Sequence, residues 1–152
     1  MTLYERISNY NNGKNTALFY LNKKITYNKL LSNIKRLVSY FTKVGIKKGD
    51  VVTVVLPNIP SSIYTFYALD AIGAIQNIVH PLTSFDKILE TMEETNSKNV
   101  VLLATLYQNN IEKINQTKFN FIFANPMYDN SILMRKLFYI KYKKIIETNQ
   151  IF

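Results

Sequence analysis

The chain has 152 residues, enough for one domain with a hydrophobic core and too few for two comfortable ones. Hydrophobic residues make up 47% and charged residues 19%, a composition that excludes an intrinsically disordered chain. The sequence contains no cysteine, which excludes disulfides and thiolate metal sites and is compatible with a reducing cytoplasm.

A formal net charge of +9 raises the question of a nucleic acid or a membrane surface as partner. The lysines are scattered, however, and one dense cluster stands out, at Arg135, Lys136, Lys141, Lys143 and Lys144. Neither an RNA-binding aromatic signature nor a helix-turn-helix is visible, so we expect no nucleic-acid partner. Residues 1–15 lack the apolar segment of a signal peptide, and no apolar run is long enough to cross a bilayer. We therefore expect a cytoplasmic protein.

The beginning of the chain predicts a short helix and a hairpin. Leu3 to about Tyr10 favours the helix, with Leu3 and Ile7 on one side. The apolar run Ala17–Leu21 and the extended residues 24–26 favour two strands, with Asn22 and Lys23 turning the chain between them.

Residues 26–60 hold the strongest pattern in the sequence. Apolar side chains recur at steps of three and four residues from Tyr27 to Val44, which predicts an amphipathic helix capped by Thr26. Gly45 ends this helix, because glycine takes the left-handed conformation that the turn requires. After a turn at Gly49 and Asp50, the β-branched run 51–56 predicts a strand buried on both faces.

Helices and strands then alternate with short connections. The expected elements are a helix from Pro60 that Gly73 ends, a strand at 75–79, a helix introduced by Thr83 and Asp86 as a capping pair, a strand at 100–104, a weak helix around 106–114 and a strand at 119–123. This order predicts an α/β fold in which helices flank a mostly parallel sheet. We expect an N-terminal helix and hairpin at 1–25, an α/β subdomain at 26–125, and a basic, apolar tail at 126–152. The apolar residues of this tail do not form one clean stripe.

The motifs that hold nucleotide phosphates are not visible in the sequence. A dinucleotide fold requires closely spaced glycines between a strand and a helix, and neither that pattern nor a Gly-Lys-Ser/Thr loop occurs. The glycines are at Gly13, Gly45, Gly49 and Gly73.

Several polar residues are weak candidates for chemistry. His80 follows a strand directly, but without a nucleophile beside it a structural role is favoured, since Ser84 belongs to a helix start. The adjacent Glu93 and Glu94 indicate a solvated helix face, and Asp70 indicates an exposed position or a local ion pair. With one histidine and scattered acids, we expect no metal site.

An aromatic group in the helix after Pro60 has two interpretations. Tyr64, Phe66 and Tyr67 could line an acyl pocket, but at helical spacing such residues more often belong to the core.

A series of short motifs in residues 25–104 resembles the N-terminal subdomain of the adenylate-forming acyl-CoA synthetases, also called AMP-binding ligases. The resemblance rests on their order and spacing: Thr26-Tyr27 with Leu30, the turn 45–50 (GIKKGD), residues 54–60 (VVLPNIP), residues 66–69 (FYAL), residues 72–74 (IGA) and residues 80–83 (HPLT). Two departures are Ser61 and Lys29, where the family commonly has acidic residues.

The resemblance implies a ligase that joins a carboxylic acid to ATP and then to coenzyme A, with Mg²⁺, in reactions such as those of fatty acid metabolism. The family's phosphate loop, its ribose-binding Asp and its C-terminal lysine all lie downstream of the matched portion. No catalytic, cofactor-binding or metal residue is therefore carried over to this chain. The resemblance implies an N-terminal ligase fragment, inactive alone, whose partners are the remainder of the ligase and its acid substrate.

The alternative is a non-catalytic module that docks through residues 132–146, which are both apolar and basic. Its partner would be a complementary ligase fragment or, less favoured, an anionic membrane surface.

Overall fold

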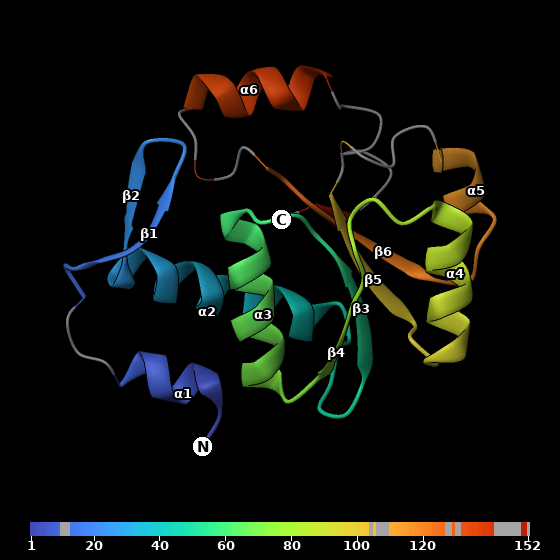
Figure 1. The fold of residues 1–152 in the computed structure, drawn as a ribbon, viewed down its shortest axis with the longest axis horizontal. Helices are drawn as coiled ribbons and strands as arrows, with labels where there is room; N and C mark the ends of the chain where they lie inside the picture. The colour runs from blue at the N-terminus through green and yellow to red at the C-terminus, as the bar shows by residue number, and fades with distance from the viewer. Residues whose placement is uncertain are drawn as a thin grey trace. The chain divides into compact units, whose positions relative to one another are not determined.

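The computed structural model describes residues 1–9, 13–103, 105, 110–126, 129, 132–141 and 150–151 (Figure 1). The chain divides into two compact units, which are described separately. The first consists of Met1–Asp50 and Ser62–Ile75, and the second of Val51–Ser61 and Gln76–Phe152.

The first unit begins with α1 (Leu3–Ser8) and the antiparallel hairpin of β1 (Thr16–Tyr20) and β2 (Lys23–Thr26). The hairpin turns at Leu21 and Asn22, whose φ angles are 44° and 62°. The turn therefore lies one residue earlier than the sequence suggested. Positive φ at both central residues suits the right-handed twist of the two strands.

The helix α2 (Tyr27–Lys43) confirms the strongest sequence prediction. Its first turn is capped by the hydroxyl of Thr26, which accepts the amide of Lys29 at 3.3 Å. At its end, Gly45 has a φ of 93° and donates to Thr42, while Ile46 donates to the carbonyl of Phe41 at 3.0 Å. These two bonds form a Schellman motif, and the apolar residue beyond the glycine folds back into a buried position.

The helix α3 (Pro60–Ile72) ends in the same way. Gly73, with a φ of 80°, donates to Asp70, and Ala74 donates to the carbonyl of Leu69 at 3.0 Å. From Ser62 onward, the residues of α3 belong to the first unit.

The second unit is built on a five-stranded sheet with the order β4-β3-β5-β6-β7. Its elements are β3 (Val51–Val55), β4 (Ile75–Ile78), α4 (Phe85–Glu94), β5 (Asn99–Leu103), α5 (Ile111–Asn115), β6 (Asn120–Ala124), α6 (Ile132–Lys141) and β7 (Gln150–Ile151). The pairs β3 with β5, β5 with β6, and β6 with β7 are parallel. The predicted α/β class, with a parallel sheet and a separate hairpin, is confirmed.

The core of the second unit lies between the sheet and its helices. It includes a stack of aromatic rings, in which Phe121 lies between Phe85 and Phe123 at centroid distances of 6.0 and 6.4 Å. Val100 and Leu102 of β5 complete the contact with α4, and both are fully buried. The continuous apolar run of β5 thus reflects a strand covered on both faces.

Some expectations need correction. Ser84, not Thr83, caps α4, because its hydroxyl accepts the amide of Lys87 at 3.4 Å. The strand β7 was not predicted at all. Ala104 and residues 106–109 of the weak helix expected around 106–114 lie outside the described residues, and α5 begins at Ile111. The division at residues 25 and 125 stays a prediction.

Among the described residues, no helix is long and apolar enough to span a membrane.

Candidate functional site

The carboxyl edge of the parallel sheet is where a ligand site is expected in this architecture. In the second unit, Pro57 and Asn58 follow β3, His80 follows β4, and Asn125 follows β6. Most of the residues directly after β5 lie outside the described part of the chain.

His80 is exposed and takes part in a tight turn. Its Nδ1 accepts the amide of Leu82 at 3.2 Å, and its carbonyl accepts the amide of Thr83 at 3.0 Å. An accepting Nδ1 places the proton of the neutral ring on Nε2. The hydroxyl of Ser84 accepts the amide of Lys87 as the cap of α4, and within the described part of the chain no hydrogen bond joins it to His80. The structural role expected of His80 stays a prediction.

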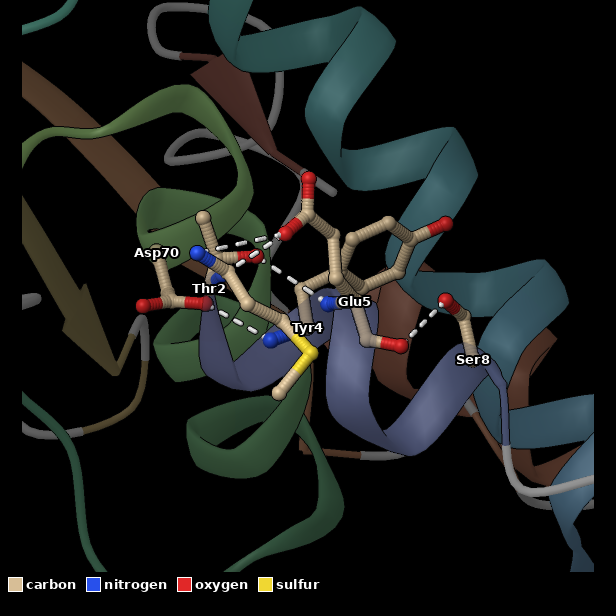
Figure 2. A network of polar contacts seen from close by, with 6 residues as sticks. Thr2, Tyr4, Glu5, Ser8 and Asp70 are labelled. Atoms are coloured by element: carbon tan, nitrogen blue, oxygen red, sulfur yellow. Dashed lines mark hydrogen bonds and ion pairs between the residues drawn. The ribbon is translucent and has the colours of Figure 1, made fainter.

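Asp70 has a specific role within the first unit. Its Oδ2 accepts the backbone amide of Tyr4 at 2.7 Å, in the first turn of α1 (Figure 2). The same turn has a full capping box, in which Thr2 and Glu5 bond each other's backbone amides. A carboxylate there satisfies a free amide and complements the positive end of the helix dipole. Asp70 therefore tethers α1 to α3, an arrangement that the sequence did not reveal.

The acidic side chains of α4 are solvated. Glu93 and Glu94 are exposed, and Glu93 pairs with Lys118 at 3.5 Å. The hydrogen bond that Lys87 donates to Glu90 raises the pKa of that ammonium. Within the described part of the chain, no three His, Asp or Glu side chains converge as a metal site would require.

Two shallow hollows lie beside α4, toward the amino ends of β5 and β6. The first measures about 610 Å³ and the second about 570 Å³, and they share Glu93, Lys118 and Phe119. Glu93 and Lys118 of both hollows pair with each other, and Asp86 of the second hollow pairs with Lys113 at 2.9 Å. This edge is opposite to the one where α/β sheets bind ligands.

The core interpretation of the aromatic group of α3 holds for Tyr64 alone, since Phe66 and Tyr67 are half-buried. Tyr64 is buried, and Phe66 and Tyr67 form an edge-to-face pair with centroids 5.3 Å apart. In α2, burial raises the pKa of Tyr40 to about 12. Its phenol therefore stays neutral through the physiological range.

A buried polar network ties together the amino ends of the strands in the second unit, and sequence reasoning missed it. Ser97 lies just before β5, and its Oγ accepts the amide of Thr53 at 3.0 Å. The same hydroxyl lies 3.0 Å from the carbonyl of Val51 and 2.8 Å from that of Asn99. Asn77 of β4 donates to the hydroxyl of Thr53 at 3.4 Å. The available signal was a polar residue, Thr53, inside an apolar strand.

Comparison with known families decides the identity of this scaffold. The family model described as "AMP-binding enzyme" matches residues 6–131. The chain belongs to this family. The expected resemblance to adenylate-forming acyl-CoA synthetases is thereby confirmed.

Curated relatives include two acetyl-coenzyme A synthetases. The enzyme of Sinorhizobium medicae is 47% identical over 60 residues, which is 40% of this chain and 9% of that protein. The enzyme of Rhizobium meliloti is 42% identical over 73 residues, which is 44% of this chain and 11% of that protein. The matched segments thus span about a tenth of the length of these relatives.

Solved structures show the same fold. A benzoate CoA ligase from Burkholderia xenovorans superposes with a TM-score of 0.74 at 15% identity, covering 84% of this chain and 26% of that chain. A mutant form of coronafacic acid ligase from Pectobacterium brasiliense gives 0.75 at 20% identity, covering 86% and 27%.

Proposed function

We propose that this chain supplies N-terminal scaffold of an ATP-dependent carboxylic acid–CoA ligase, and that these 152 residues alone do not catalyse adenylation. The observation that carries the proposal is the coverage: the family model matches residues 6–131, and the superposed structure of a benzoate CoA ligase is covered over only 26% of its chain. The complete enzyme would act in the cytoplasm on a carboxylic acid, with ATP, Mg²⁺ and coenzyme A.

The described residues do not provide the groups that would bind a nucleoside triphosphate. Stabilising the charge of a transferring phosphoryl or adenylyl group requires backbone amides and cations fixed around it. Gly45 and Gly73 end helices, and Gly49 lies in the turn before β3, so none of these follows a strand. The described residues that directly follow β3, β4 and β6 include Asn58, His80 and Asn125 but no lysine or arginine. We therefore assign no step of the reaction to residues of this chain.

An assay of pyrophosphate exchange into ATP tests the proposal. The folded chain should give no exchange above background with acetate, benzoate or a long-chain fatty acid, while an acetyl-CoA synthetase assayed in parallel should give exchange with acetate. Exchange by the chain alone that depends on any of these acids would refute it. Circular dichroism on the same sample establishes that the chain is folded.

The DNA that follows the codon of Phe152 provides an independent test. A continuing or adjacent frame that encodes a Thr/Ser/Gly-rich loop ending in Lys-Gly would support the proposal. An adjacent coding sequence unrelated to ligases, with no such frame, would argue for an independent module.

A further inference from the structure

The helix α6 carries apolar side chains on two different faces. Phe138 is buried and belongs to the aromatic core of the second unit. Leu133, Leu137 and Ile140 are instead exposed to 66%, 52% and 71%. Their spacing of four and three residues places them in one row along the helix. Within α6, Phe138 is thus a buried anchor and Leu133, Leu137 and Ile140 form an outward row, while Met134 and Tyr139 are exposed to 44% and 47% outside this row.

Basic side chains flank this outward row. Lys136 precedes Leu137 and Lys141 follows Ile140, and a step of about 100° per residue puts the two lysines on opposite sides of the row. Both lysines are exposed. The helix also contains Arg135 and has no acidic residue, in a chain with a net charge of +9.

We propose that α6 (Figure 1) binds the surface of anionic lipid membranes, with Leu133, Leu137 and Ile140 entering the acyl region and Lys136 and Lys141 at the headgroups. An apolar row between two cationic edges is the arrangement of helices that lie in a membrane interface. A protein partner would not require cations on both edges of the row. Because Phe138 fixes the helix on the core, the row is presented to the membrane without local unfolding.

A single-tryptophan reporter tests the proposed contact. The chain has no tryptophan, so Ile140→Trp introduces one fluorophore in the row, and Phe19→Trp on β1 provides a control with the same 71% exposure. Vesicles of phosphatidylglycerol and phosphatidylcholine in equal parts should shift the emission of Ile140→Trp to the blue, and brominated lipids should quench it. The Phe19→Trp emission should change little with the same vesicles.

Sedimentation with these vesicles tests the residues without a reporter. The double substitution of Leu133→Gln and Leu137→Gln should lower vesicle binding by roughly tenfold or more, because both side chains lose their transfer from water. Lys136→Gln should lower vesicle binding roughly fivefold and make the remaining binding less dependent on salt concentration. Leu82→Gln, which replaces an exposed leucine outside α6, should leave binding unchanged.

Two results would overturn the proposal. One is equal binding to anionic and to pure phosphatidylcholine vesicles, which would remove the role of the lysines. The other is that the chain binds no vesicles, whereas the Leu133→Gln, Leu137→Gln double variant loses self-association or binding to a ligase fragment. That result would assign the row to a protein partner. The substituted positions are exposed, and unchanged thermal unfolding would show that the variants fold.

Discussion

Replacing Ser97 by alanine should destabilise the second unit far more than the loss of one ordinary hydroxyl. Ser97 is 1% exposed, and its Oγ accepts the amide of Thr53 while reaching the carbonyl of Val51. The side chain of Ser97 therefore hydrogen-bonds to the backbone of β3 in the way that a residue of the neighbouring strand would. Alanine offers neither acceptor nor donor, so polar groups of buried backbone lose their partner.

Two backbone groups, the amide of Thr53 and the carbonyl of Val51, lose their partner. Each buried donor or acceptor without a partner costs about 1–3 kcal/mol, so Ser97→Ala should lower the free energy of unfolding by about 2–6 kcal/mol. For a chain of this length, the corresponding fall in Tm is roughly 4–24 °C. Urea unfolding followed by circular dichroism measures the change, with the slope m expected to stay constant.

Ser39→Ala is the matched control. Ser39 lies on the exposed face of α2, and its Oγ donates to the carbonyl of Lys35 at 3.2 Å. Water replaces that bond and alanine favours the helix, so stability should change by less than about 0.5 kcal/mol. Equal effects of Ser97→Ala and Ser39→Ala would refute the role assigned to the buried hydroxyl.

Four further substitutions test the first unit. Thr65 is fully buried, and its Oγ1 has no hydrogen-bond partner among the described residues. Thr65→Val should therefore raise the free energy of unfolding by about 1 kcal/mol. A loss of stability would show that the hydroxyl has a partner. Gly45→Ala should lower the free energy of unfolding by about 1 kcal/mol, because Gly45 has a positive φ. Gly73→Ala should lower it further in the same denaturation assay, because its new Cβ would also lie 3.0 Å from Cγ of Lys48. Equal losses for the two variants would contradict this close contact. Since burial raises the pKa of Tyr40 from 10.0 to about 12, the folded state resists ionisation that the unfolded chain accepts, and stability should fall as pH rises through that window. Tyr40→Phe should reduce this fall in urea unfolding at high pH, and an unchanged pH profile would exclude Tyr40 as its source.

The sequence predicted those parts of the fold that depend on local chemistry. The end of α2 followed from Gly45 and the apolar residue beyond it, because a Schellman motif is specified by a few neighbouring residues. The buried strand β5 followed from its continuous apolar run. The choice of Ser84 over Thr83 as the cap of α4 was missed, because both hydroxyls stand before the same helix and the backbone decides between them.

Long-range contacts were beyond local reasoning. The bond from Tyr4 to Asp70 joins residues far apart in the chain, and nothing in either segment specifies the other. The strand β7 has two residues, too few to show a period. In α6, the helical pattern alone did not separate Phe138, which is buried, from Ile140, which is exposed, because both are large apolar residues. No site residue was predicted from the sequence, because the resemblance implies that the residues of the chemistry lie downstream of the matched portion.

The most direct test of the central claim is a chimera in which the 60-residue segment of the Sinorhizobium medicae acetyl-CoA synthetase that matches this chain is replaced by this chain's segment. If the segment is scaffold, the folded chimera should keep acetate-dependent exchange of pyrophosphate into ATP, with a modest loss of rate. A chimera that folds with native stability but gives no exchange would contradict the claim that this part of the chain supports the active site without contributing to its chemistry.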